Sequence, residues 1–135
     1  MKYSARPCGP ATSVIPKEPD RDFLRHAMAA TLASGEACFD FLVQPRAPSM
    51  SVEDSTREWS EAEAPFVKVA TITIPSQTFD TPEQQRTCED LSFTPWNAHV
   101  EHRPLGVTNR VRRVVYEAVS AFRHERNGRP LAVPR

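Results

Sequence analysis

Thirteen prolines against four glycines constrain this chain of 135 residues more than any other feature of its sequence. Proline fixes φ and has no backbone N–H, so most of these positions must lie in loops, at strand ends or at helix starts. Four of the prolines fall between Pro7 and Pro19, a segment that is therefore predicted to be an irregular loop. The regular elements must lie between the prolines, and the connections that join them are expected to be long and stiff.

A helix is predicted over residues 21–34, directly after this loop. Apolar residues recur there at helical spacing, Asp20 can cap the first turn, and Gly35 lies just past the last one. A short strand is predicted ahead of the loop, over residues 2–6. The chain therefore begins with a strand, a loop and an amphipathic helix.

Two further strands are predicted on either side of an acidic connection. Aromatic and aliphatic residues alternate with other residues over 37–44, which is the period of a strand. The Val, Ile and Thr run of 66–74 is the clearest strand, and it is predicted to lie at the centre of its sheet. Between them, residues 45–64 carry five acidic residues against two basic ones, which predicts a solvated, irregular connection.

The second half of the chain is predicted to be mainly helical. A threonine followed by a proline favours a short helix over residues 81–90. A longer helix follows, with Thr108 or Asn109 as its cap and Gly128 just beyond its end. Residues 129–135 are predicted to be a tail.

Charge and hydropathy exclude several kinds of partner. Seventeen basic and seventeen acidic residues cancel, so no overall field attracts nucleic acid or an anionic membrane. No stretch approaches the roughly 18 apolar residues of a membrane span, and the first residues contain no apolar targeting core. A cytoplasmic protein with no nucleic-acid and no membrane partner is predicted.

The cysteines and histidines predict no metal site. Cys8, Cys38 and Cys88 are odd in number and form no CxxC pair, which argues against a disulfide framework and predicts reduced, mostly buried thiols. His99 lies near a second histidine, but H-x-x-H without another close ligand pair is typical of a polar loop. His124 is predicted to be exposed on the last helix, and no residue is assigned as a catalytic acid or base.

The last helix combines an apolar face with a narrow polar stripe. At 100° per residue one face is apolar and is expected to pack on the rest of the protein. It consists of Val111, Val114, Val115, Ala118 and Phe122. Arg112, Tyr116 and Arg123 lie within roughly 40° of one another at its border. An arginine one turn before a tyrosine can donate to its phenolic oxygen and favour the tyrosinate, which is a known proximal ligand of ferric haem.

A simpler interpretation of this spacing is a solvated basic helix. The segment also contains Arg110, Arg113, Arg126 and Arg129, so some arginine would neighbour Tyr116 by chance. The alternative function is therefore a non-enzymatic interaction module that uses this Arg-rich helix to bind an acidic partner or nucleic acid.

Linked motifs make the chain similar to a known family. Residues 88–96 (CEDLSFTPW) and 112–116 (RRVVY), placed after a helix, an aromatic strand and a Val/Ile strand, resemble the haem catalase superfamily. Residues 101–106 (EHRPLG), followed by Asn109, look more closely like the bacterial catalase-related proteins. The resemblance runs from about residue 2 to residue 127.

The resemblance implies an α+β fold and a cofactor. Residues 1–135 would be the C-terminal portion of one catalase-like haem domain, a partial antiparallel β-barrel with an amphipathic helix and a C-terminal haem-ligand helix. Tyr116 would be the metal ligand, as the tyrosinate of a ferric haem, and Arg112 would hydrogen-bond its oxygen. Arg123 would lie near the ligand or a haem propionate. Hydroperoxide is the substrate class that the resemblance implies.

The sequence also departs from the family. Catalases have a proline and an Asp-Thr pair after the ligand tyrosine, whereas Glu117-Ala118-Val119 continues the helix here, so propionate contacts do not transfer. The family's distal histidine and asparagine come from an N-terminal half that is absent from these residues. We therefore expect a haem-binding protein that is inactive as an isolated chain, with a second chain or an upstream half completing the barrel.

Overall fold

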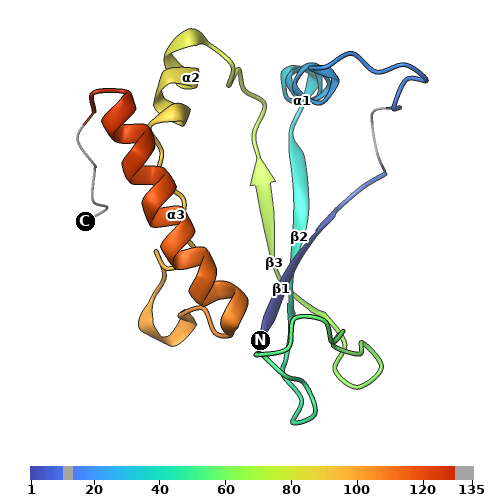
Figure 1. Ribbon diagram of the computed structural model, residues 1–135. Coiled ribbons are helices and arrows are strands. Elements are labelled where there is room, and N and C mark those ends of the chain that lie inside the picture. The colour runs from blue at the N-terminus through green and yellow to red at the C-terminus, as the bar shows by residue number, and fades with distance from the viewer. Residues whose placement is uncertain (11–13, 130–135) are drawn as a thin grey trace. The chain divides into compact units, whose positions relative to one another are not determined.

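The computed structural model describes residues 1–10 and 14–129 of the chain. Two compact units are formed, which we call unit 1 (Met1–Ala47 and Trp59–Thr81) and unit 2 (Pro48–Glu58 and the residues from Pro82 onward). Figure 1 shows the elements of both units. Of the predicted tail, 129–135, only residue 129 lies within the described residues.

Unit 1 contains an antiparallel sheet of three strands in the order β1-β2-β3. The strands are β1 (Lys2–Pro7), β2 (Ala37–Gln44) and β3 (Val67–Ile74), which confirms the three that the sequence predicts. Tyr3 of β1 stacks on Phe41 of β2, with 5.5 Å between the ring centroids. Together with the helices the sheet gives an α+β fold, and over the residues described it is open and does not close into a barrel.

β3 lies at an edge of the sheet, so the prediction of a central position is wrong. β2 is the central strand, because it pairs with β1 on one side and with β3 on the other. The register shifts between Phe41 and Leu42, and Val69 of β3 has no paired residue on β2. β-branched residues favour strands because their side chains fit a pleated surface. An edge strand offers that surface as well as a central strand does, so the run does not indicate a position in the sheet.

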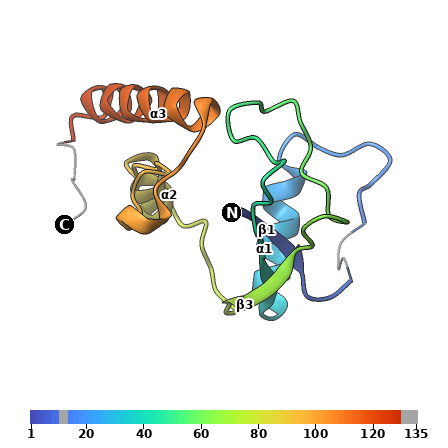
Figure 2. The same cartoon turned by 90° about the horizontal axis from the view of Figure 1, so that it is seen from below.

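Helix α1 (Phe23–Ser34) confirms the predicted amphipathic helix, which starts two residues later than expected. The carboxylate of Asp20 accepts the backbone N–H of Asp22 at 2.7 Å, and this contact orders the entry to the helix. At the other end, the carbonyl of buried Leu32 accepts the hydroxyl of Ser76 at 2.8 Å. Figures 1 and 2 show α1 running across the strand direction, near the start of β2.

Gln44 closes β2 and fixes the end of the acidic connection. Its side chain is fully buried, and Nε2 donates to the carbonyl oxygens of Ala64 at 2.9 Å, Trp59 at 3.3 Å and Ser60 at 3.5 Å. Its Oε1 is buried and has no hydrogen-bond partner within the described part of the chain. One amide group thus bridges three backbone carbonyls at the end of the acidic connection.

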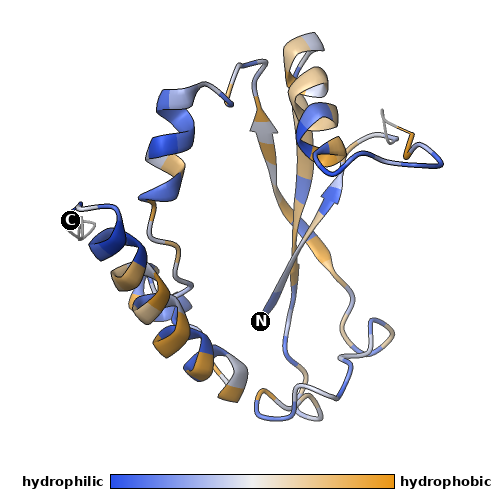
Figure 3. Cartoon of the chain, turned by 45° about the horizontal axis from the view of Figure 1, so that its top comes forward, coloured by the Kyte–Doolittle hydropathy of each residue, from blue (hydrophilic) through white to orange (hydrophobic). Residues whose placement is uncertain are grey.

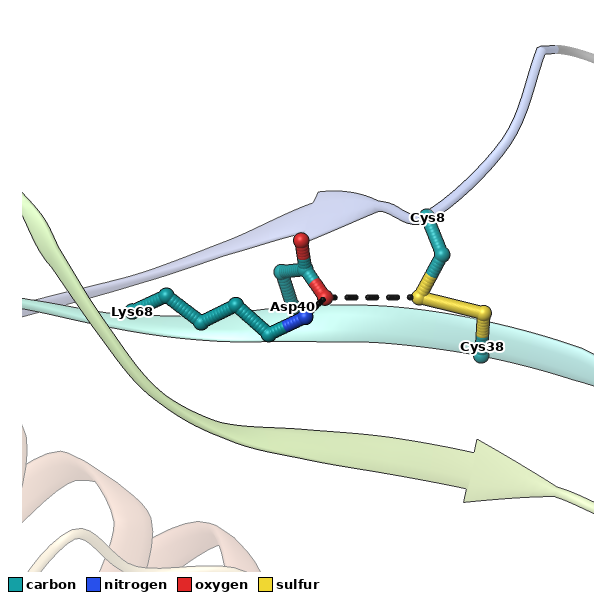
Figure 4. Close-up of a disulfide and its surroundings, with 4 residues drawn as sticks. All are labelled: Cys8, Cys38, Asp40 and Lys68. Atoms are coloured by element: carbon teal, nitrogen blue, oxygen red, sulfur yellow. Dashed lines mark hydrogen bonds and ion pairs between the residues drawn. A yellow bond between two sulfur atoms is a disulfide. The ribbon is translucent and has the colours of Figure 1, made fainter.

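Cys8 and Cys38 form a disulfide, so the prediction of reduced thiols is wrong for this pair. Their Cα atoms are 5.6 Å apart because the pairing of β1 with β2 brings them opposite each other, which their spacing in the sequence does not reveal. Figure 4 shows the disulfide beside Asp40, whose carboxylate pairs with Lys68 of β3 at 2.5 Å and lies 3.6 Å from Cys8 Sγ. Cys88 is a free thiol and is exposed rather than buried.

Unit 2 contains α2 (Pro82–Glu89), the short 3-10 helix η1 (Val100–His102) and α3 (Val107–Arg126). α2 begins at a proline, as the sequence predicts. α3 begins before both of the predicted cap residues, because Gly106 stands at its N-cap, and it ends ahead of Gly128 as expected. Among the residues described, no helix is both long enough and apolar enough to cross a membrane.

Candidate functional site

The start of α3 is capped by a loop of the same unit, residues 48–58, and not by a side chain of its own. Glu53 in this loop accepts two hydrogen bonds from Arg110, at 3.0 and 2.7 Å. Its carboxylate also accepts the backbone N–H of Val107. A carboxylate at a helix N-terminus satisfies an otherwise unpaired N–H and interacts favourably with the helix dipole. The direction in which α3 leaves the loop is thereby fixed.

Gly106 permits the close approach between this loop and α3. Its φ of 91° lies in the left-handed region, which glycine adopts without steric cost. A Cβ at this position would overlap the carbonyl oxygen of Val52. Both conditions require glycine immediately before the helix.

A polar face of α3 packs against the chain segment that precedes it. Trp96 Nε1 donates to the carbonyl of Asn109 at 3.3 Å, and the guanidinium of Arg113 lies 4.8 Å from the Trp96 ring. Further along the helix, the hydroxyls of Ser92 and buried Ser120 are 2.5 Å apart. These contacts set the rotation of α3 about its axis.

His124 belongs to this packed face, so the prediction that it is exposed is wrong. Its side chain is only 3% exposed, and its Nε2 lies 3.4 Å from the hydroxyl of Ser92. At 100° per residue it falls about 40° from Ser120, on the buried side of the helix. A buried histidine engaged by a serine is not available as an acid or base at the stripe of Arg112, Tyr116 and Arg123.

Within the described part of unit 2 the apolar face of α3 is not covered, and its packing on the rest of the protein stays a prediction. Val111, Val114, Val115 and Phe122 are 58%, 69%, 50% and 61% exposed. Figure 3 shows hydrophobic residues along the length of α3. The packing contacts of unit 2 lie on the opposite side of the helix, so no described residue of that unit covers this face.

Arg112 and Tyr116 are hydrogen-bonded, as their spacing predicts. Arg112 Nη2 donates to the Tyr116 hydroxyl oxygen at 3.2 Å, and the guanidinium lies 5.2 Å from the centre of the tyrosine ring. Nη1 of the same arginine donates to Asn109 Oδ1 at 3.4 Å. The Tyr116 hydroxyl oxygen therefore accepts a hydrogen bond from a cationic side chain one turn earlier on the same helix.

Arg123 is directed away from the phenolic oxygen. Its Nη2 donates to the backbone carbonyl of Leu91, and its Nε is buried without a hydrogen-bond partner among the described residues. Of the three residues on the predicted stripe, the structure joins Arg112 to Tyr116 and anchors Arg123 to the segment before the helix. The unsatisfied Nε leaves this guanidinium with a donor to spare.

Other parts of the described chain offer no competing metal site. No group of three or more histidine, cysteine, aspartate or glutamate side chains that could hold a metal occurs there.

A polar cavity of about 550 Å³ lies beside α2. It is lined by Glu83, Arg86, Thr87, Asp90 and Arg129. Its two carboxylates balance its two guanidiniums, so it has no net charge with which to select a ligand.

The contact between Glu53 and Arg110 predicts a pH dependence. The pKa of the Glu53 carboxyl lies below its ordinary value of 4.5, chiefly because Arg110 hydrogen-bonds to its charged form. Ionised Glu53 therefore stabilises unit 2 above the ordinary glutamate pKa, and this contribution is lost as the pH falls through the lower pKa of the folded state. Glu53→Gln is expected to reduce the acid sensitivity of unit 2, measured by Trp96 fluorescence in urea at a series of pH values in a Trp59→Phe background.

Glu125→Gln is the matched control for this change, since Glu125 is exposed near the far end of α3. It should keep the wild-type pH dependence. If Glu53→Gln kept it as well, the cap would not contribute to stability.

Comparison with known proteins adds no family to this description. Searches with protein-family models, of curated proteins and of solved structures give no match to the chain. The functional interpretation therefore depends on the residues of α3 and their geometry.

Proposed function

We propose that the chain is a haem-binding, catalase-like protein in which Tyr116 is the axial ligand of a ferric haem. The observation that carries the proposal is the hydrogen bond from Arg112 to the Tyr116 hydroxyl at 3.2 Å. A tyrosine ligates ferric iron as the tyrosinate, and a fixed guanidinium beside its oxygen stabilises that charge. The two residues are also those that resemble the proximal Arg-x-x-x-Tyr motif of the catalase superfamily.

The surroundings of this pair suit a porphyrin. Val115 and Phe122 lie on the exposed apolar face that borders Tyr116, and a flat apolar ring placed over them would remove that surface from water. Arg123 carries a positive charge two turns after Tyr116 on the same helix, so its guanidinium can interact with a propionate. The residues present therefore fit the group that the motif implies.

Bound haem would supply the redox chemistry of hydroperoxide conversion. The residues of this chain would hold the group, and Arg112 would hydrogen-bond the ligand oxygen. No acid or base is assigned, because His124 is buried in the packed face of α3. A positioned acid–base group contributes roughly 10²- to 10⁴-fold to rate, so turnover by this chain alone is expected to be slow. A second chain or an upstream segment would complete a catalase-type barrel and the distal side.

The alternative, an interaction module with an Arg-rich helix, is less well supported by the contacts of α3. Arg110 is held by Glu53, and Arg112 by its bond to Tyr116. Arg113 pairs with Glu117 at 3.1 Å besides stacking on an indole. These guanidiniums are already engaged within unit 2, and the chain has no net charge to attract an acidic partner.

Titration of the purified chain with haemin tests the proposal. The wild type is expected to give a shifted Soret band with saturable binding, and Tyr116→Phe is expected to abolish the shift. Tyr3→Phe is a matched control, because the chain has two tyrosines and Tyr3 lies in β1 of unit 1. If the wild type gave no shift, or if Tyr116→Phe bound haemin with the wild-type spectrum, the ligand assignment would be wrong.

A further inference from the structure

The outer edge of β3 is open. β3 pairs with β2 on one side only, and no other strand among the described residues pairs with it. An edge strand presents a row of unpaired N–H and C=O groups that can pair with another strand. All residues of β3 except the last, Ile74, are exposed. The exposed fractions of Val69 and Ile72 are 56% and 45%.

The two edges of this sheet differ in their protection. β1 carries Lys2, Arg6 and Pro7, which are charges and a proline of the kind that block strand addition. After the unpaired Val69, the sequence of β3 is Ala-Thr-Ile-Thr-Ile, which contains no charged residue, glycine or proline. The charge of β3 is on Lys68, which pairs with a carboxylate of β2 inside the sheet. The β3 edge is therefore the one that accepts a further strand.

The sequence of this edge is complementary to itself. In an antiparallel pairing related by a two-fold axis at Ile72, this residue meets its own copy and Ala70 meets Ile74. On the other face of the sheet, Thr71 meets Thr73. Directly opposed threonines stabilise a sheet through cross-strand hydrogen bonds, and the apolar pairs bury side-chain surface on the other face. No charge opposes the contact, since Lys68 lies outside the paired segment.

We propose that β3 pairs with β3 of a second copy of this chain, so that two three-stranded sheets join into one of six strands. The symmetry is that of an isologous dimer, in which the same surface is used by both copies. This interface uses only unit 1, so its test does not depend on whether α3 of unit 2 binds haem.

Cross-linking tests the register. Paired residues in an antiparallel ladder have Cα atoms about 4.5–5.5 Å apart, within the range of a disulfide. Ile72→Cys, made with Cys88→Ser to remove the free thiol, is expected to form a covalent dimer on mild oxidation. Leu24→Cys in the same background, exposed on α1, should remain a single chain on a non-reducing gel. Equal cross-linking of both variants would overturn the proposal.

Sedimentation equilibrium tests the association itself. The wild type is expected to have twice the chain mass of 15.2 kDa, and Ile72→Lys, which places two ammonium groups opposite each other, should weaken the dimer at least tenfold. Leu24→Lys should leave the dimer intact, and circular dichroism checks that each variant is folded. A wild type of single-chain mass, or a dimer that survives in Ile72→Lys, would overturn the proposal. If Ile72→Lys does not fold, the cross-link decides.

Discussion

Gly106→Ala is expected to destabilise unit 2 more than any other exchange of glycine for alanine in the described chain. The φ of 91° costs an L-residue about 1–3 kcal/mol, and the new Cβ would also overlap the Val52 carbonyl oxygen, a backbone atom that cannot move alone. The loop that carries Glu53 must then separate from the start of α3. Urea unfolding followed by Trp96 fluorescence in a Trp59→Phe background measures the loss, since Trp96 lies in unit 2 and Trp59 in unit 1.

Gly128→Ala is the matched control, because Gly128 has a φ of 62° and open space around the position of a Cβ. Gly128→Ala should lose stability only through its positive φ, because the new Cβ would overlap no atom of the described residues. Equal midpoints for the two variants would show that the close approach to Val52 does not constrain unit 2.

Gln44→Glu is expected to have the second large effect, in unit 1. The replacement has nearly the same shape, but an ionised carboxylate cannot donate and would face three backbone carbonyl oxygens in a fully buried site. An uncompensated buried charge costs about 3–5 kcal/mol. Trp59 fluorescence in urea, measured in a Trp96→Phe background, reports on this unit. Part of the stability should return at low pH, where the protonated group can donate.

Gln77→Glu is the control for Gln44→Glu. Gln77 also donates to a backbone carbonyl, that of Pro75 at 3.1 Å, but it is exposed. Its replacement should shift the midpoint little. A small effect at Gln44 as well would mean that its amide does not hold the acidic connection.

Local sequence signals were sufficient for most of the elements. The strands of the sheet, α1, α2 and α3 follow from periodicity, from Asp20 before α1 and from the proline that opens α2. Each of these signals acts over a few neighbouring residues. The edge position of β3 and the Cys8–Cys38 disulfide depend on which strands pair, and neither propensity nor cysteine spacing contains that information.

The same distinction holds for the candidate site. The hydrogen bond between Arg112 and Tyr116 was predictable, because residues four apart on a helix lie on the same side. The burial of His124 was not predictable, because the apolar residues of α3 lie on the opposite face and predicted that face to be the packed one. The contact of Glu53 with the start of α3 was not predictable either, because Glu53 and Arg110 are 57 positions apart in the sequence.

Ligation of ferric haem by Tyr116 is tested most directly by resonance Raman spectroscopy of the haemin complex. Vibrations of an iron-bound tyrosinate are predicted for the wild type and for Tyr3→Phe, and they should be absent from Tyr116→Phe. Arg112→Ala is expected to keep these bands but to bind haemin about 10- to 100-fold more weakly, the usual effect of losing a hydrogen bond to a charged group. A wild-type complex without tyrosinate bands, or bands that persist in Tyr116→Phe, would contradict the assignment.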